Sequence, residues 1–350
     1  MTEVMVSVGG LLERLAEGPV ICAEGYLFEF ERRGYLQAGA FVPEIVLEHP
    51  ELVAGLHREL VHAGSDVVEA FTYYAHREKL RIIGSEHLIE PLNREALAIA
   101  RAVAAEHGCL AAGNLSNTNV FAPDAAGRRE VRRMFEEQLQ WIVDAGMDFV
   151  IAETFSWGEE AMIALQAIVE TGLTAVVTLA IHRAPEVREG WSPADACARL
   201  EQAGADVVGL NCIRGPETML PLLADVRAAV RCPVAALPVP YRTTPQEPSM
   251  QSLTDPGCDC LPGYRPFPTA LEPLSCNRYE IARFAVRARE LGVGYLGLCC
   301  GAAPHTIRSL AEALGRATPA SRYSPDMSRH AFLGSDASLR AHNRTYATEL

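Results

Sequence analysis

Short apolar runs alternate with helix-length segments along most of this 350-residue chain. An apolar run of about 4–8 residues predicts a buried strand, whereas apolar residues three and four positions apart predict a helix. Eight such runs occur, at 20–23, 67–71, 109–114, 149–153, 175–181, 207–212, 234–238 and 295–299. Helical spacing separates several of them, most clearly over 43–63, 94–106 and 129–145. This alternation is the strongest constraint on the fold.

Eight strands that are each followed by a helix predict a parallel sheet closed into a (β/α)8 TIM barrel, an α/β fold. The phrases AGSD, AGMD, AGAD and LGVG each precede a strand, where a glycine can end the preceding helix. An open, doubly wound sheet is the alternative. It is disfavoured because no GxGxxG fingerprint follows the first run.

Two segments interrupt the alternation. Residues 238–273 hold nine of the 22 prolines and show no periodicity, so we expect a long irregular loop, and such loops are often functional. The tail after Pro319 is polar, with a short helix expected within 338–350. We therefore divide the chain into a barrel over 1–318 and a short C-terminal arm over 319–350.

Composition excludes several classes of function. The chain has 31 Lys and Arg against 44 Asp and Glu, a formal net charge of −13, which argues against nucleic acid or an anionic membrane as partner. No uncharged apolar run reaches the ~18–20 residues that cross a bilayer. The N-terminal segment lacks the basic head and long apolar stretch of a signal peptide. With ten cysteines and no export signal, we expect a cytoplasmic protein with reduced thiols.

Three cysteines fall at the carboxyl ends of predicted strands, where barrels carry their chemistry. Cys212 ends VVGLNC, and Cys299 and Cys300 end YLGLCC. Three thiolates at one point repel one another unless a soft cation holds them, and Zn²⁺ with three protein ligands and an open position is the usual catalytic arrangement. The plainer interpretation is three buried apolar residues. A vicinal pair with a third thiol at matching strand ends favours zinc. We treat Cys258 and Cys260 as a feature of the Pro-rich loop.

These motifs carry a family resemblance. GLNC at 209–212 and GLCCG at 297–301 resemble the zinc motifs of the homocysteine S-methyltransferases, most closely their betaine-dependent members. FERRGYLQAG from Phe30 and DFVIAETF from Asp148 are similar as well, and the similarity runs from about Leu12 to the tail. The resemblance implies a (β/α)8 barrel, a Zn²⁺ held by Cys212, Cys299 and Cys300, and methyl transfer to the sulfur of homocysteine.

The resemblance also suggests which residues bind homocysteine, the methyl acceptor. Glu153 matches a family glutamate that holds the amino-acid end of homocysteine. The resemblance also assigns Thr72 and Asn211 to the substrate site, on a weaker match. The family usually has an aspartate at the end of the first strand, where this chain has Ala23 followed by Glu24. Either Glu24 replaces that aspartate or the acceptor is held differently.

An onium methyl donor has its charge wrapped in methyl groups, so aromatic faces attract it. We expect Phe41, Tyr73, Tyr74 and Trp157 to form a cage at the barrel mouth. Phe41 stands where the betaine-dependent members have a tryptophan, and Thr154 stands where they have a tyrosine. The donor can therefore differ from glycine betaine.

The leading hypothesis is zinc-dependent transfer of a methyl group from glycine betaine, or a similar onium compound, to homocysteine, giving methionine. A sulfonium donor such as dimethylsulfoniopropionate or S-methylmethionine is the alternative. A hypothesis of another class, motivated by Ala23, is a non-catalytic, zinc-binding regulatory barrel. The resemblance further implies a homodimer, with the arm over 319–350 in the contact.

Overall fold

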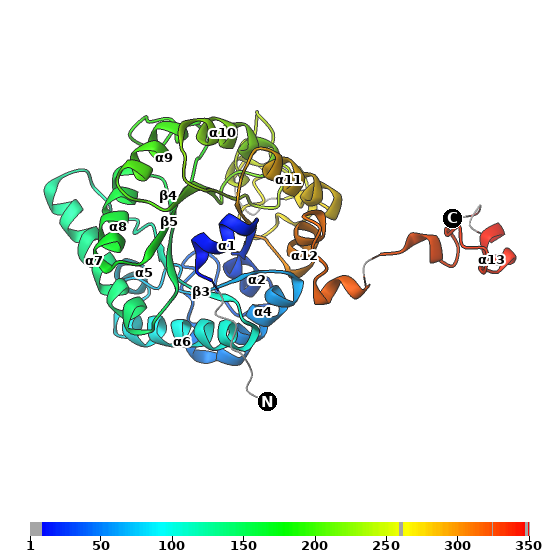
Figure 1. Cartoon of the computed structure of the whole chain (residues 1–350), viewed down its shortest axis with the longest axis horizontal. Coiled ribbons are helices and arrows are strands. Elements are labelled where there is room, and N and C mark those ends of the chain that lie inside the picture. The colour runs from blue at the N-terminus through cyan, green and yellow to red at the C-terminus, as the bar shows by residue number, and fades with distance from the viewer. Residues whose placement is uncertain (1–8, 259–261, 324, 347–348, 350) are drawn as a thin grey trace.

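The computed structural model describes residues 9–258, 262–323, 325–346 and 349. Its centre is a closed barrel of eight parallel strands in the order β1 to β8, so the predicted TIM barrel is confirmed. Helices surround the barrel as an outer ring (Figure 1). The strands are β1 (Val20–Ala23), β2 (Val67–Glu69), β3 (Leu110–Ser116), β4 (Phe149–Phe155), β5 (Thr174–Leu179), β6 (Val207–Asn211), β7 (Val234–Leu237) and β8 (Tyr295–Leu298).

The α-helices are α1 (Leu11–Glu17), α2 (Tyr26–Arg32), α3 (Ile45–Glu48), α4 (Pro50–Ala63), α5 (Arg77–Ile82), α6 (Ile89–His107), α7 (Ala125–Asp144), α8 (Gly158–Thr171), α9 (Pro193–Gln202), α10 (Pro216–Ala229), α11 (Arg278–Glu290), α12 (Pro304–Ala313) and α13 (Ala341–Tyr346). Five short 3₁₀ turns are η1 (Glu86–Leu88), η2 (Met250–Ser252), η3 (Glu272–Leu274), η4 (Pro319–Tyr323) and η5 (Met327–Arg329). Helix α1 covers the amino-terminal end of the barrel, because its Leu11 and Leu15 pack with the interior residues of the strands.

The helical segment expected over 43–63 is in fact two helices, α3 and α4. The break falls at His49, whose φ of −141° and ψ of 60° lie outside the helical region. Proline disfavours the helical conformation in the residue before it, and Pro50 then begins α4 with a φ that suits a first turn. The chain therefore turns where the apolar spacing alone predicts continuity.

A recurrent aspartate fixes the register of neighbouring strands at the amino-terminal end of the barrel. In AGSD, AGMD and AGAD, the aspartate precedes a strand and accepts a hydrogen bond from a backbone N–H of the strand before it. The three bonds are Ile21 N to Asp66 Oδ2 at 2.7 Å, Ala111 N to Asp148 Oδ2 at 2.7 Å, and Ala175 N to Asp206 Oδ2 at 2.8 Å.

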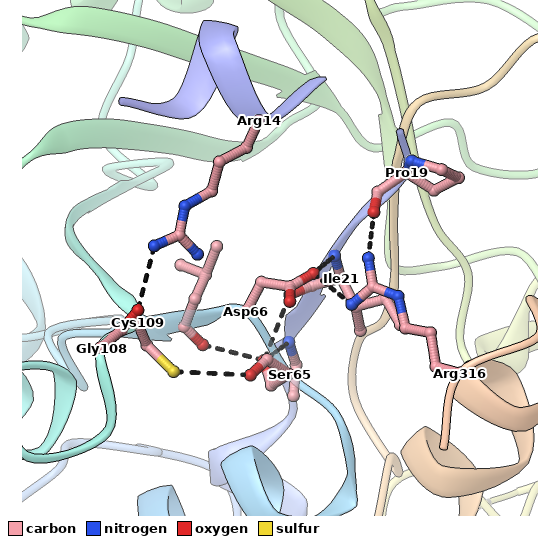
Figure 2. Close-up of polar contacts among 10 residues, drawn as sticks. Arg14, Pro19, Ile21, Ser65, Asp66, Gly108, Cys109 and Arg316 are labelled. Atoms are coloured by element: carbon pink, nitrogen blue, oxygen red, sulfur yellow. Dashed lines mark hydrogen bonds and ion pairs between the residues drawn. The ribbon is translucent and has the colours of Figure 1, made fainter. Parts of the chain in front are cut away.

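Asp66 also links this end of the barrel to the end of the helical ring. Figure 2 shows that Arg316, which follows α12, donates from Nη1 to Asp66 Oδ2 at 2.6 Å and from Nη2 to the carbonyl of Pro19. Ser65 donates to the carbonyl of Val67 at 2.8 Å in the same network. The last β/α unit is thereby tied to the first, which supports closure of the barrel.

The interior of the barrel changes character along its length. Side chains alternate between the two faces of a strand. Toward the amino-terminal end the inward positions are apolar, and they include Val20, Leu110, Phe149, Val207 and Tyr295. Following the same alternation to the carboxyl ends, the inward positions are Glu24, Asn114, Glu153, Asn211 and Cys299, all of them buried. The barrel thus presents a polar, acidic and thiol-bearing layer only at its carboxyl-terminal end.

The arm expected over 319–350 leaves the barrel after η4, which packs against α4 and α12. It then extends away from the barrel, with α13 near its end (Figure 1). The Pro-rich loop runs from β7 to α11 and holds η2 and η3, so the expectation of a long irregular segment is confirmed. Among the described residues, no helix has the length and apolar character needed to cross a membrane.

One buried histidine gives the fold a pH dependence. His57 on α4 is 1% exposed, and its ring lies edge-on to Tyr26 with centroids 5.0 Å apart. Burial, with a smaller contribution from the charge of Arg58, lowers the pKa of His57 from its usual 6.5 to about 3. The unfolded chain therefore binds a proton at this residue below about pH 6.5, whereas the folded chain does not.

Stability is consequently lost as the pH falls from 6.5 toward 3, by about 2 kcal/mol between pH 7 and pH 5 for this residue alone. We expect the substitution His57→Leu to reduce the pH dependence of the free energy of unfolding by that amount, measured by urea denaturation at the two pH values. His62→Leu, on the exposed side of the same helix, is the control. An unchanged pH dependence in His57→Leu contradicts this account.

Candidate active site

The three predicted thiols meet at the carboxyl-terminal end of the barrel. The Sγ atoms of Cys212, Cys299 and Cys300 lie within 4.8 Å of one another. Cys212 directly follows β6, and Cys299 and Cys300 directly follow β8. Hydrogen bonds from the thiols of Cys299 and Cys300 lower the pKa of Cys212, and the same bonds to Cys212 raise the pKa of both donors. The cluster favours a thiolate even before a cation is considered.

The turn that carries Cys212 has an unusual backbone. Cys212 and Ile213 have φ angles of 54° and 57°, the left-handed region that non-glycine residues rarely adopt. Backbone hydrogen bonds hold this turn: Arg214 N donates to the Cys212 carbonyl at 2.6 Å, and Met250 N donates to the Ile213 carbonyl at 2.7 Å. The second bond comes from the Pro-rich loop. That loop therefore supports the conformation that presents Cys212.

The same loop also supports the turn after β8. Cys299 N donates to the carbonyl of Pro238 at 3.0 Å. Gly301 has a φ of +94°, and a Cβ atom there would lie 2.3 Å from the hydroxyl oxygen of Tyr241, so only glycine fits. That hydroxyl accepts a hydrogen bond of 2.7 Å from Arg32 Nη2, and Arg32 Nε donates to Glu272 at 2.7 Å. One loop thus positions all three thiols.

An acidic cavity, about 320 Å³ with its opening, lies on one side of the thiols. It is lined by Glu24, Gly25, Tyr26, Leu27, Glu69, Ala70, Phe71, Tyr73, Asn114, Glu153, Cys299 and Cys300. Three of these are carboxylates that are 2–3% exposed, and the lining includes no Lys or Arg. Burial raises the pKa of Glu24, Glu69 and Glu153, the last to about 7. These carboxyl groups therefore favour the protonated form unless a cation enters the cavity and compensates their charge.

Two asparagines hold the carboxylates of the acidic cavity in place. Asn114 Nδ2 donates to Glu69 at 2.6 Å and to Glu153 at 2.7 Å. Asn211 Nδ2 donates to the other oxygen of Glu153 at 2.7 Å and lies 3.9 Å from the Sγ atom of Cys299. Glu153 is thereby tied to the thiol cluster.

Glu24 differs from the other two carboxylates. Both of its oxygens are buried and have no hydrogen-bond partner among the described residues. One of them lies within 4.8 Å of a Glu153 oxygen and of the Cys299 Sγ atom. The alternation along β1 explains this position, because Val20 and Cys22 face the barrel interior and the next inward residue is Glu24. Ala23, which the resemblance places at the family aspartate, belongs to the outward set.

A second cavity, about 740 Å³ with its opening, lies on the other side of the thiols. We call it the aromatic cavity. It is lined by Leu27, Phe28, Phe41, Tyr73, Tyr74, Asn117, Asn119, Thr154, Ser156, His182, Arg188, Cys212, Ile213, Met250, Gln251, Phe267 and Cys300. No Asp or Glu belongs to this lining. The two cavities share Leu27, Tyr73 and Cys300, so both reach the thiol cluster.

Backbone strain is concentrated around the aromatic cavity. Seven described non-glycine residues have a positive φ, and six of them line this cavity: Phe41, Tyr74, Asn119, Thr154, Cys212 and Ile213. Each such residue costs about 1–3 kcal/mol and persists only where the surroundings hold it. Strain of this kind clusters at functional sites. The distribution therefore marks the aromatic cavity as a candidate binding site.

Five of the predicted substrate-binding residues line these cavities, and Thr72, Trp157 and Asn211 line neither. Phe41, Tyr73 and Tyr74 line the aromatic cavity, and Glu24 and Glu153 line the acidic one. Thr72 lines neither, since its hydroxyl donates to the carbonyl of Asn114 at 3.0 Å. Trp157 lines neither as well; its ring packs on Phe121 with centroids 5.5 Å apart. Asn211 lies between Glu153 and Cys299, as a positioning residue.

Sequence reasoning missed Glu69, Asn114, Phe28 and Phe267. Glu69 and Asn114 are polar residues at inward positions of buried strands, VVEAF and LAAGN, and that pattern could have indicated them. Phe28 and Phe267 carry no comparable signal. Cys258 belongs to none of the metal-ligand groups found among the described residues, and Cys260 lies outside those residues.

A family model described as homocysteine S-methyltransferase matches residues 23–314. The chain belongs to this family. It is therefore an S-methyltransferase that transfers a methyl group to homocysteine. Betaine–homocysteine S-methyltransferase 1 of Danio rerio is 38% identical over 313 residues, covering 87% of this chain and 75% of the relative. S-methylmethionine–homocysteine S-methyltransferase BHMT2 of Pongo abelii is 34% identical and covers 87% of this chain and 81% of the relative.

The fold agrees with a solved structure of the same family. The homocysteine methyltransferase MmuM of Escherichia coli, in its metallated form, superimposes with a TM-score of 0.67, covering 86% of this chain and 99% of that chain. The two sequences are 17% identical, so this likeness supports only the fold of this homocysteine S-methyltransferase.

The thiol cluster fits a metal ion, and each cysteine should be needed to retain it. We expect Cys212→Ala, Cys299→Ala and Cys300→Ala each to lose most of the bound metal on dialysis against a chelator, because two thiolates do not hold an ion securely. Elemental analysis of the purified proteins measures this. Cys197→Ala, at a buried free cysteine on α9, is the control and should keep its metal. Undiminished metal in Cys299→Ala would show that the cluster is not the ligand set.

Proposed function

We propose that this homocysteine S-methyltransferase uses Zn²⁺ and takes its methyl group from glycine betaine or a similar onium compound, giving methionine. One observation carries this proposal. Two cavities of opposite character, one acidic and one aromatic, meet at the same three thiols. An amino-acid acceptor and an onium donor need such different surroundings and a common meeting point.

The acidic cavity suits the amino-acid end of homocysteine. Its three buried carboxylates lack a basic partner in the lining, and a substrate ammonium group would supply one. The unpartnered oxygens of Glu24, with the nearby Glu153, are the groups best placed to bind the substrate ammonium. On this proposal Glu24 takes the role of the family aspartate, and the substitution at Ala23 leaves the acceptor site intact.

Zn²⁺ suits the thiol cluster because soft thiolate ligands select it over hard cations, and three protein ligands leave a position open. When bound there, zinc supplies a Lewis acid that keeps the acceptor sulfur as a thiolate. Cys212, Cys299 and Cys300 would hold it. All three thiols are free, and they serve only while reduced, which favours a reducing compartment such as the cytoplasm.

The aromatic cavity suits an onium methyl donor. Phe28, Phe41, Tyr73, Tyr74 and Phe267 contribute aromatic rings to its wall, and a well-placed ring attracts an onium group by roughly 0.5–2 kcal/mol. In the reaction a carbon–sulfur bond forms to homocysteine while the donor's methyl–heteroatom bond breaks. The electron pair of that bond stays with the donor, which leaves as a tertiary amine or a thioether, and the thiol proton passes to solvent.

A sulfonium donor is the second candidate. The relative from Pongo abelii is named for S-methylmethionine, and this chain has Phe41 and Thr154 in its aromatic cavity, where the resemblance expects a tryptophan and a tyrosine. A cavity with less aromatic surface places weaker demands on the size of the onium group. Glycine betaine and sulfonium donors must therefore be compared directly.

The test is methionine formation by the zinc-loaded protein from homocysteine with glycine betaine, dimethylsulfoniopropionate and S-methylmethionine in turn. We expect turnover with at least one donor. In Glu24→Gln we expect the KM for homocysteine to rise about tenfold or more, because a charged partner of the ammonium group becomes neutral. Zinc content and the KM for the donor should change little.

Glu29→Gln is the control, since Glu29 lies on α2, pairs with Arg33 and lines neither cavity. Absence of methionine with every donor favours the non-catalytic regulatory barrel instead. An unchanged KM for homocysteine in Glu24→Gln removes Glu24 from the acceptor site and leaves Glu153 as the remaining candidate.

We also propose a homodimer in which the arm over 319–350 contacts a second copy of the chain. The arm extends from the barrel and exposes apolar side chains, among them Met327, Leu333 and Tyr346 at 57%, 63% and 49%. Such side chains on a projecting segment favour contact with a partner. In sedimentation velocity over a range of concentrations, we expect a dimer for the full chain and a shift to monomer for Leu333→Glu. A monomeric full chain contradicts the proposal.

A further inference from the structure

The lining of the aromatic cavity includes one arginine, Arg188, in addition to the aromatic rings. Arg188 lines this cavity together with His182 and Ser156, while the thiols of Cys212 and Cys300 lie in another part of the same lining. The lining contains no Asp or Glu. A molecule bound there therefore meets a guanidinium group at one place and the thiol cluster at another.

Arg188 is an exposed residue whose backbone is held by the end of a neighbouring strand. Its backbone N–H donates to the carbonyl of Ser156 at 2.9 Å, which ties the loop after β5 to the end of β4. Its guanidinium group lies over the ring of Trp157, 5.7 Å from the ring centroid. The indole that we expected to contact the donor thus holds a cation of the protein itself.

The neighbouring acids are engaged elsewhere. Glu189, the next residue along the chain, accepts hydrogen bonds from Gly158 N at 2.9 Å and Glu159 N at 2.7 Å, at the start of α8. Glu160 accepts from the backbone and the hydroxyl of Thr118, at 2.8 and 2.6 Å. Both carboxylates accept their hydrogen bonds from donors other than the Arg188 guanidinium, although the charge of Arg188 offsets part of the rise in the pKa of Glu160 that burial causes.

We propose that Arg188 binds the carboxylate of the methyl donor and so restricts the enzyme to donors that carry an onium group at one end and a carboxylate at the other. This inference rests on the proposed function and names the class of donor. Arginine is always charged and offers a planar pair of N–H donors that matches a carboxylate. The onium end then lies toward the thiols and the aromatic rings.

The same charge arrangement disfavours a donor with an additional ammonium group. S-methylmethionine carries such a group beside its carboxylate, and the lining of the aromatic cavity offers it no carboxylate partner. Glycine betaine and dimethylsulfoniopropionate lack it. The structure therefore favours net-neutral donors over net-cationic ones, although a relative of this chain is named for S-methylmethionine.

A pair of matched donors tests this role directly. Dimethylsulfoniopropionate and ethyldimethylsulfonium have the same reacting group, but only the first has a carboxylate. In Arg188→Gln we expect kcat/KM for dimethylsulfoniopropionate and for glycine betaine to fall at least about tenfold, mainly through KM, because a charged hydrogen-bonding partner is lost. The value for ethyldimethylsulfonium should change less than about twofold, and Arg188→Lys should recover part of the loss.

Arg183→Gln is the control, because Arg183 is an exposed arginine of the same loop that does not line the aromatic cavity. Equal losses for both sulfonium donors would show that Arg188 has only a structural role. No loss for either would show that it does not bind the donor. A raised KM for homocysteine alone would assign Arg188 to the acceptor's carboxylate. Failure of the parent protein to use any donor overturns the proposed function itself, and this proposal with it.

Discussion

The concentration of buried acidic groups and thiols at one end of the barrel is the constraint on which the site depends. Three thiols lie within 4.8 Å of one another, and three carboxylates with raised pKa values line the adjoining acidic cavity. Buried charges of one sign are stable only when cations compensate them. The lining of the acidic cavity contains no Lys or Arg. These carboxyl groups therefore ionise only when cations arrive with the metal and the substrates.

This constraint explains why the chemistry is divided between two cavities. An ammonium group, a soft metal ion and an onium methyl group are all cations, but each needs different partners. Carboxylates and amide groups hold the first, thiolates hold the second, and aromatic faces attract the third. The Pro-rich loop holds the thiols between the cavities through Pro238, Tyr241 and Met250.

Much of this arrangement could be predicted from the sequence, because it follows from strand periodicity. The eight apolar runs give the barrel, and the position of Cys212 and Cys299 at the ends of two runs brings the thiols together. The same period of two also places Glu24 inside the barrel and Ala23 outside, so the inward carboxylate after the first strand is that of Glu24. Glu69 and Asn114 follow the same rule and could have been included.

What the sequence could not predict depends on backbone conformation and on loop contacts. Nothing in the residue types of Phe41, Tyr74 or Thr154 indicates a positive φ. Trp157 follows a strand as expected. Its ring, however, packs against the guanidinium group of Arg188, which lies 31 positions later in the chain. Such pairings between separate loops have no periodic signature.

The central claim is that acceptor and donor occupy different cavities on either side of the thiols. A crystal structure of the metal-loaded protein with homocysteine tests this most directly. The account predicts the amino group of homocysteine within hydrogen-bonding distance of Glu24 and Glu153, its sulfur at the thiol cluster, and the aromatic cavity free of acceptor. Homocysteine bound in the aromatic cavity, with its carboxylate on Arg188, would contradict the account.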